Sequence, residues 1–184
     1  MTAGDAEAPD RANNRRVLVS AASRHGATAE IAQAIGQALA EQGLTVTVIP
    51  PGEVRNLDGY DAVIIGSAVY MGHWLDSAKE LVNRFHDALT DRPVWLFSSG
   101  PVGNPSSKLA QSMDQDPADL PGMLEATHAR DHRRFAGKLD RKVLSFPQRA
   151  SLLVFRGLNG DFRDWTEIRQ WAESIAQQLA LAPR

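Results

Sequence analysis

The stretch SAASRHGATAEIAQAIG, residues 20–36, decides the fold class because its hydrophobic pattern changes from that of a strand to that of a helix. Residues 15–22 form an apolar run with β-branched side chains, which is typical of a buried strand. After a short polar loop, isoleucine and leucine recur at helical spacing between residues 31 and 39, and Gly43 stands where a helix C-terminal cap belongs. The stretch therefore predicts a strand, a loop and a helix.

The rest of the chain continues this alternation of strand and helix patterns. Further apolar runs predict four more strands, at residues 44–50, 61–69, 92–100 and, with a more polar and less buried character, 127–139. Helical spacing predicts two more helices, at residues 75–89 and 164–182. Strands that alternate with helices form parallel sheets covered on both faces. The predicted fold class is therefore α/β, with three layers and a five-stranded parallel sheet in the order 2-1-3-4-5.

The composition limits the classes of protein to which the chain can belong. Its 184 residues fit one domain, predicted at 15–184, after a polar and acidic segment at 1–14 that we expect to be a disordered tail. The formal net charge of −2 gives no reason to expect nucleic-acid binding, and the absence of cysteine excludes disulfides and thiolate metal sites. The five histidines lack ligand spacing, so we expect no metal site. Without a signal-peptide pattern or a long apolar stretch, we expect a cytoplasmic protein.

Three loops matter for function, because ligands of such sheets bind beyond the carboxyl ends of the strands. The first loop, residues 23–28, combines hydroxyls, a glycine and two basic side chains at the start of a helix. Unpaired backbone N–H groups and the helix dipole favour an anion at such a place. Two interpretations are open from these residues alone: the loop binds a phosphate, or it is an ordinary turn in which Thr28 caps the helix.

The second and third loops carry weaker signals. The second, residues 66–76, places Tyr70 and Trp74 beyond a strand end, where an aromatic side chain either stacks on a planar ring or covers the sheet. The third, residues 98–108, is rich in proline and glycine and can direct backbone groups at the edge of a heterocycle, although alone it is only a turn. The position of all three loops on one sheet edge favours a binding site over three unrelated turns.

The motifs in these loops carry a resemblance to a known family. The segment LVSAASRHGATAEIAQAI resembles the FMN phosphate loop of flavodoxins, whose pattern of roughly Ser/Thr-x-x-Gly-x-Thr is here Ser23, Gly26 and Thr28. The segments YDAVIIGSAVYMGHW, HRRFAGKLD and DWTEIRQWAESIA are similar to the flavodoxin-domain family that includes bacterial menaquinone-dependent protoporphyrinogen oxidase. The resemblance covers about residues 15–180 and implies a flavodoxin-like fold. Ala27 departs from the pattern, since many flavodoxins carry a polar residue there.

The resemblance implies FMN as the cofactor, with three groups of contacts. The phosphate would be held by Ser23, Arg24, His25, Gly26, Ala27 and Thr28. The isoalloxazine would be bordered by Ser67, Ala68, Val69, Tyr70, Met71, Gly72 and Trp74. Its pyrimidine edge would be contacted by Ser98, Ser99, Gly100, Pro101, Val102 and Gly103. We expect FMN rather than FAD, because the first loop can hold one phosphate and the chain lacks a dinucleotide-binding pattern.

The resemblance also implies a flavin-dependent oxidoreductase of a small redox substrate, with quinone-linked oxidation of protoporphyrinogen IX as the leading reaction. The flavin supplies the redox chemistry, so no catalytic side chain is assigned. An NAD(P)H-quinone reductase and a flavodoxin-type electron carrier stay open as alternatives. Residues 130–163 hold nine Lys or Arg against three Asp. For the basic and apolar part at 138–156, two interpretations stay open. It binds an anionic substrate or contacts a membrane surface peripherally, or it is an ordinary helix packed on the core.

Overall fold

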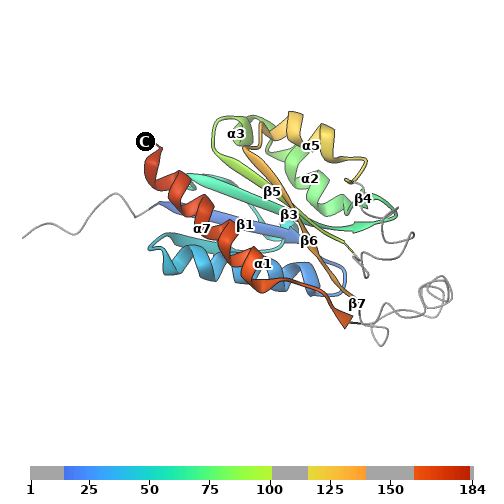
Figure 1. Ribbon diagram of the computed structural model, residues 1–184. Coiled ribbons are helices and arrows are strands. Elements are labelled where there is room, and N and C mark those ends of the chain that lie inside the picture. Colours follow the sequence, from blue (N-terminus) through green and yellow to red (C-terminus); the bar gives the residue numbers. More distant parts are fainter. Residues whose placement is uncertain (1–14, 101–115, 140–159, 183–184) are drawn as a thin grey trace, which may run out of the picture.

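The computed structural model describes residues 15–100, 116–139 and 160–182, and it has the predicted three-layer α/β/α architecture (Figure 1). Five parallel strands form the central sheet in the order β2-β1-β3-β5-β6, which is the predicted order 2-1-3-4-5. These strands are β1 (Arg16–Ala22), β2 (Thr45–Val48), β3 (Ala62–Tyr70), β5 (Val94–Gly100) and β6 (Asp131–Ala136). A short strand, β4 (His73–Trp74), returns antiparallel along the end of β3.

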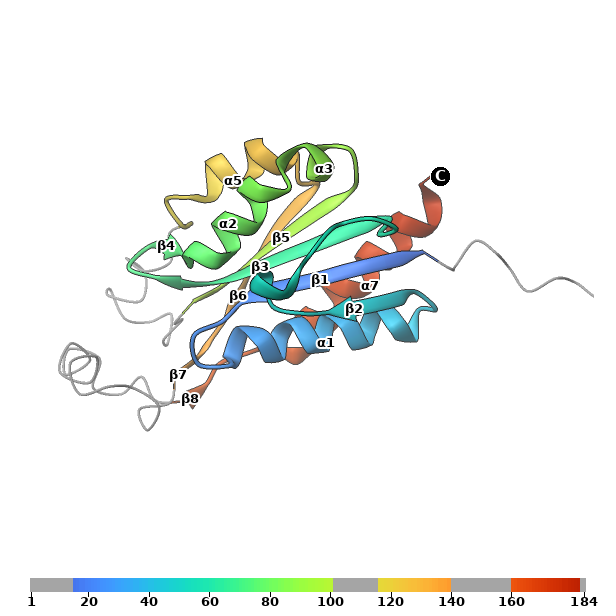
Figure 2. The same cartoon turned by 180° about the vertical axis from the view of Figure 1, so that it is seen from behind.

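Helices cover both faces of the sheet (Figures 1 and 2). One face carries two helices that contact each other, α1 (Ala27–Glu41) and α7 (Trp165–Leu181). The other face carries three, α2 (Asp76–Arg84), α3 (His86–Thr90) and α5 (Leu120–Thr127). The remaining elements are a 3-10 turn, η2 (Pro51–Glu53), and a two-stranded antiparallel ribbon, β7 (Lys138–Leu139) with β8 (Gly160–Asp161).

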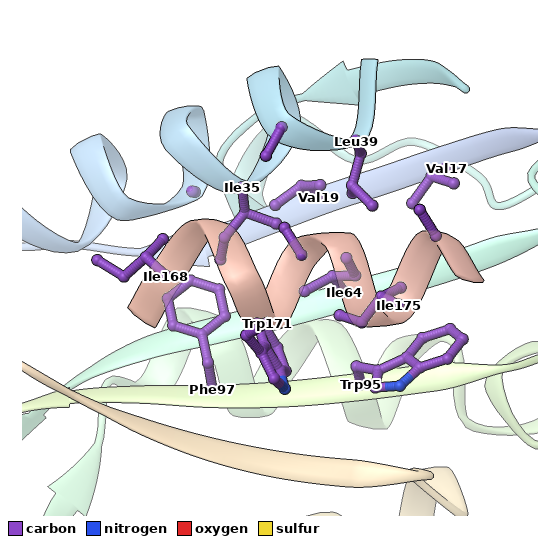
Figure 3. Packing of buried hydrophobic residues seen from close by; sticks show 14 of the residues in the cluster. Val17, Val19, Ile35, Leu39, Ile64, Trp95, Phe97, Ile168, Trp171 and Ile175 are labelled. Carbon is purple, nitrogen blue, oxygen red and sulfur yellow. The ribbon is translucent and has the colours of Figure 1, made fainter. Parts of the chain in front are cut away.

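The face covered by α1 and α7 has an aromatic core (Figure 3). Phe97 on β5, Phe135 on β6 and Trp171 on α7 pack against one another at steep angles, with ring centroids 5.5 to 6.2 Å apart. Phe97 needs space on the neighbouring strand, because a Cβ added at Gly66 would lie 2.1 Å from its ring. Gly66 is therefore a packing requirement at the centre of the sheet.

Burial along the strands follows their sequences. β3, at the centre of the sheet, is buried from residue 62 to residue 68, which agrees with its uninterrupted apolar run. β6, at the edge, is mostly half-buried, which agrees with its polar residues. Along β1, Val17 and Val19 face α1, and Leu18 belongs to the cluster under α2. The strands at the centre therefore fix a rigid base from which the loops project.

The helix predicted at 75–89 is wrong in one respect, because it is divided into α2 and α3. Phe85 leaves helical geometry at φ −118° between the two helices. The preceding Arg84 donates to the carbonyls of Pro51 and Val54, at 3.1 and 3.0 Å. These contacts span 33 and 30 positions of sequence, so the hydrophobic period alone does not reveal them.

The sequence does not predict α5, and the fifth strand starts later than expected. Pro121 and Gly122 in the first turn of α5 are turn signals, although proline is tolerated at the start of a helix. His128 ends α5 in a left-handed conformation with φ 48°. The strand predicted at 127–139 is therefore β6, which begins only at residue 131.

Candidate functional site

The three predicted loops start from one end of the sheet, because the carboxyl ends of β1, β3 and β5 lie side by side. The register pairs Ala22 with Ser67, and Ser67 with Ser98. The start of α1, the β3–β4 hairpin and the β7–β8 ribbon lie at this end, to the right in Figure 1 and to the left in Figure 2. We call this end the carboxyl edge and the opposite end of the sheet the amino edge.

The loop between β1 and α1 leaves backbone donors free at the helix start. Gly26 is the N-cap residue and has a φ of 88°, a left-handed conformation that glycine adopts without strain. Its N–H donates to the Ser23 hydroxyl oxygen at 3.0 Å. The first helical hydrogen bond runs from Glu30 N–H to Gly26 O at 2.9 Å, so the N–H groups of residues 27–29 have no partner within the helix. These three donors can bind an anion.

Thr28 does not cap the helix, which corrects one of the two interpretations of this loop. It is the second residue of α1, and Gly26 occupies the cap position. Thr28 is only 2% exposed. Helical side chains lean toward the N-terminus of their helix, which for Thr28 is the direction of the loop. Ala27, the first residue of α1, has one of the N–H groups without a helical partner.

Two side chains of the first loop lie against the ring of Tyr70, in the second loop. The guanidinium carbon of Arg24 is 4.8 Å from the ring centroid, and the ring of His25 meets it edge-on at 6.3 Å between centroids. Burial raises the pKa of the Tyr70 hydroxyl, and the charge of Arg24 partly opposes that shift. A half-buried aromatic ring therefore lies against the loop that leads into α1.

A two-residue turn, Met71 and Gly72, joins β3 to β4. Their φ values are 53° and 78°, the combination of a type I′ hairpin turn. The Met71 side chain is 97% exposed. Val69 and Tyr70, just before the turn, are half-buried. The hairpin thus presents an apolar tip next to the Tyr70 ring.

Trp74 lies in the core and not at the surface. It is 2% exposed, and its Nε1 donates to the Ser98 hydroxyl oxygen at 2.8 Å. That oxygen is also 2.8 Å from Nε2 of His132 on β6. Burial lowers the pKa of His132, and the neutral imidazole can accept a hydrogen bond from the Ser98 hydroxyl. Of the two aromatic residues expected to stack on a ring, Tyr70 is the one placed to do so.

The Ser67 and Ser98 hydroxyls are committed inside the protein. Ser67 donates to Ala68 O at 2.8 Å and accepts from Leu75 N–H at 2.9 Å, which fixes the start of α2. At both positions, therefore, only the backbone groups are available to contact a ligand. At the end of β5, Ser99 is buried and Gly100 is half-buried. The other predicted contacts of this strand end, Pro101, Val102 and Gly103, lie outside the described residues.

Asp119 is a residue of this region that the sequence does not single out. Its carboxylate accepts from Trp74 N–H at 2.8 Å, and it lies 3.1 Å from His73 Nδ1 and 3.9 Å from Lys79 Nζ. Burial opposes ionisation of Asp119, but the hydrogen bonds from Trp74 and His73 and the charge of Lys79 outweigh it and lower its pKa. Asp119 thus holds the hairpin strand β4 against the start of α5.

Arg163, just before α7, is a second unpredicted residue, and it lies at the start of α1. Its side chain is 2% exposed and donates to Asp161, to Glu30 and to the carbonyl of Ala27. The guanidinium also covers the ring of Trp165 at 4.4 Å from the centroid. Trp165 is 43% exposed, so the first aromatic residue of the predicted helix pattern faces Arg163 and not the core.

Metal and membrane features are absent from the part of the chain that the structure describes. Within residues 15–100, 116–139 and 160–182, no group of three or more His, Asp or Glu side chains could hold a metal ion. No helix in these ranges is long and apolar enough to cross a bilayer. The segment predicted at 138–156 lies outside the described residues, apart from Lys138 and Leu139 in β7.

The strand order and the helices on both faces of the sheet define a flavodoxin-like α/β domain, and comparisons with known proteins agree. Residues 18–164 match the family described as the flavodoxin domain, so the chain belongs to the flavodoxin-domain family. No curated protein sequence matches the chain significantly.

Solved structures show the same fold. A flavodoxin from the domain Archaea superposes with a TM-score of 0.61 at 16% sequence identity, over 89% of this chain and 98% of that one. Oxidised flavodoxin 1 from Bacillus cereus gives 0.57 at 16% identity, over 88% and 97%. Rubredoxin:oxygen oxidoreductase from Desulfovibrio gigas gives 0.59 at 15% identity, over 93% of this chain but 38% of that one. At these identities the likeness concerns the fold alone.

Proposed function

We propose that the chain binds FMN at the carboxyl edge and acts as a redox protein, with an electron carrier of the flavodoxin type as the first candidate. One observation carries the proposal: the loop that leads to the free N–H groups at the start of α1 lies, through Arg24 and His25, against a half-buried aromatic ring, that of Tyr70. An anion site beside a stacking surface matches the two ends of FMN, its phosphate and its isoalloxazine. Membership of the flavodoxin-domain family supports the same cofactor.

The residues at this edge fit one phosphate and one ring system. Residues 27–29 would hold the phosphate through backbone N–H groups, with Thr28 adding a hydroxyl. Tyr70 would support one face of the ring, and Arg24 would have to leave that face or share it. Bound FMN would supply the electron-transfer chemistry, so the protein needs only to bind, orient and shield it. FAD carries two phosphates and would need a second phosphate site. The first loop leads to a single helix start, which offers a site for one phosphate.

The carrier is favoured over an enzyme because the observations concern the cofactor and not a substrate. Family membership and the nearly full-length likeness to two flavodoxins both support the simpler function. The nearby polar side chains already have partners within the protein: Ser98 and His132 bind each other, and Asp119 accepts from Trp74 N–H. Their roles are therefore structural.

A second candidate function is the oxidation of an anionic organic substrate, with protoporphyrinogen IX and a quinone as the reductant and oxidant. The observation in its favour is the basic character of the strand that leads to the carboxyl edge. Arg133 on β6 is about half exposed and lies 3.7 Å from Glu167, and Arg134 lies 4.0 Å from Asp116. The guanidinium of Arg133 could turn toward a propionate.

The first experiment is to identify the chromophore released when the purified protein, saturated with flavin, is denatured. Stoichiometric FMN supports the proposal, and stoichiometric FAD or a protein that binds neither flavin contradicts it. Anaerobic mixing of the oxidised holoprotein with protoporphyrinogen then separates the candidates. Loss of flavin absorbance with a rise in porphyrin fluorescence would support the oxidase, and rapid reduction by NAD(P)H alone would support a reductase.

A further inference from the structure

Arg163 connects three parts of the chain at the start of α1. It lies two residues after β8 and precedes Asp164, the residue that caps α7 by accepting from the N–H groups of Thr166 and Glu167. Its guanidinium forms a two-pronged contact with Asp161, with Nε at 2.7 Å and the terminal nitrogen at 2.5 Å. The other terminal nitrogen reaches α1. Arg163 is thus fixed on both sides by groups far apart in sequence.

The contacts to α1 are made in its first turn. Arg163 donates to the carbonyl of Ala27, the first helical residue, at 3.2 Å and to Glu30 at 2.7 Å. The N–H groups of residues 27–29 are the ones left free for an anion. The guanidinium therefore holds the same turn that presents the proposed phosphate donors.

The charges around this turn give Arg163 a second effect. Two carboxylates, Asp161 and Glu30, lie against the single guanidinium, and the hydrogen bonds to Asp161 raise the pKa of Arg163. The hydrogen bonds from Arg163 in turn lower the pKa of Asp161, so the Asp161 carboxylate stays ionised at neutral pH. Without the guanidinium, two unpaired negative charges would stand next to a site for a phosphate dianion.

We propose that Arg163 is a positioning residue for the phosphate of the bound flavin: it fixes the first turn of α1 and cancels the carboxylate of Glu30 beside it. This inference rests on the proposed FMN binding. It distinguishes the phosphate end of the ligand from the ring end, because Arg163 is in contact with α1 and not with Tyr70 or the β3–β4 hairpin.

The molecule contains a matched control at the other end of α1. Arg169 on α7 pairs with Glu41 in the last turn of α1 at 2.6 Å. This ion pair joins the same two helices, but it lies at the amino edge and is about half exposed. Its loss should cost at most about 1 kcal/mol of stability and should not affect the phosphate.

The test compares FMN with riboflavin, which lacks the phosphate, by titrating the apoprotein and following flavin fluorescence. Arg163→Gln should weaken FMN binding about tenfold or more and riboflavin binding less than about twofold. Arg169→Gln should leave both affinities unchanged. Thermal unfolding of each apoprotein reports any general loss of structure.

A second variant keeps the inference testable if Arg163→Gln fails to fold. Glu30→Gln removes an exposed carboxylate, and a charge-cancelling role predicts FMN binding about two- to fivefold tighter at low salt, with riboflavin unchanged. A purely structural ion pair predicts no gain, or a loss. Equal losses of FMN and riboflavin in Arg163→Gln, or unchanged or weaker FMN binding in Glu30→Gln, would overturn the role of Arg163. A wild-type protein that binds no FMN would overturn the proposed function as well.

Discussion

The two ends of the central sheet carry the same kinds of residues, but they differ in their backbone hydrogen bonds. At the amino edge the backbone N–H groups after α1 have partners, whereas at the carboxyl edge several N–H groups at the start of α1 have none within the helix. Each end of α1 has a glycine in the left-handed region, Gly26 with φ 88° and Gly43 with φ 85°. At the amino edge, Gly43 N–H and Leu44 N–H donate back to the carbonyls of Ala40 and Leu39, the pattern of a Schellman motif. At the carboxyl edge, Gly26 leaves three helical N–H groups without such partners.

The same contrast appears in two arginine–tyrosine pairs. At the amino edge, Arg16 lies 5.2 Å from the ring centroid of Tyr60, whose backbone carbonyl also accepts from Arg92 at 3.1 Å. At the carboxyl edge, Arg24 lies 4.8 Å from the ring of Tyr70. The Tyr60 loop is tied down by several bonds, whereas Tyr70 stands next to an exposed hairpin tip.

The difference shows that residue type alone does not identify the site in this fold. Glycines with positive φ and arginines on tyrosine rings stabilise turns at both edges. Only at the carboxyl edge do they adjoin free backbone donors at the start of a helix. The amino edge therefore supplies matched controls for mutations at the carboxyl edge.

The largest expected effect is on FMN affinity in Thr28→Val. Loss of a hydrogen bond to a charged phosphate costs about 1.5–3 kcal/mol, which is roughly 10- to 150-fold in affinity. The unfolding free energy of the apoprotein should change by less than about 1 kcal/mol, because the substitution keeps the shape of the side chain. Ser20→Ala, which removes a buried hydroxyl without a partner in the middle of β1, is the control and should leave FMN binding unchanged. Equal FMN affinity in wild type and Thr28→Val would remove Thr28 from the site.

The next effect separates the two glycines. A β-branched residue at a positive φ costs about 1–2 kcal/mol, so Gly26→Val and Gly43→Val should both lower the midpoint of thermal unfolding. A Cβ at Gly26 meets nothing within 4 Å, so the cost there comes from the backbone. Only Gly26→Val should also weaken FMN binding, because relaxation of its backbone redirects the N–H groups of α1. Calorimetry with and without FMN measures both quantities. Similar FMN losses in the two variants would mean that the helix ends do not differ in function.

The smallest effect compares the two tyrosines. Stacking of aromatic rings contributes about 0.5–1.5 kcal/mol, so Tyr70→Ala should weaken FMN binding roughly 2- to 12-fold. It should also raise the fluorescence of the bound flavin, because a stacked tyrosine quenches it. Tyr60→Ala should lower stability and leave both flavin readouts unchanged. An unquenched flavin in the wild type, or the same response in both variants, would contradict stacking on Tyr70.

Much of the fold can be predicted from the sequence because local periodicity determines it. The order of the sheet follows from alternating strand and helix patterns, and the parallel strands bring the three loops to one edge whatever the side chains are. The position of Gly43 after α1 follows from the same pattern. The break at Phe85 and helix α5 depend on long-range contacts or on turn residues inside a helix, which periodicity does not resolve.

The site is less predictable, because several of its residues act through distant partners. The sequence predicts Trp74 to be a loop aromatic, but a two-residue turn at Met71 and Gly72 returns it to the core as part of β4. The positive φ at both turn residues depends on pairing with β3, and the glycine is its only local signal. Arg163 meets Glu30 across 133 positions, so no motif connects them.

The most direct test of the difference between the edges is a titration of the ¹⁵N-labelled apoprotein with FMN, followed by two-dimensional NMR. The amide signals of residues 26–29 and 68–72 should shift and saturate together, and those of Gly43, Gly59 and Tyr60 should stay in place. Riboflavin should shift the signals of 68–72 but much less those of 26–29. Saturable shifts centred on the amino edge, or binding that leaves residues 26–29 unperturbed, would contradict a phosphate site at the start of α1.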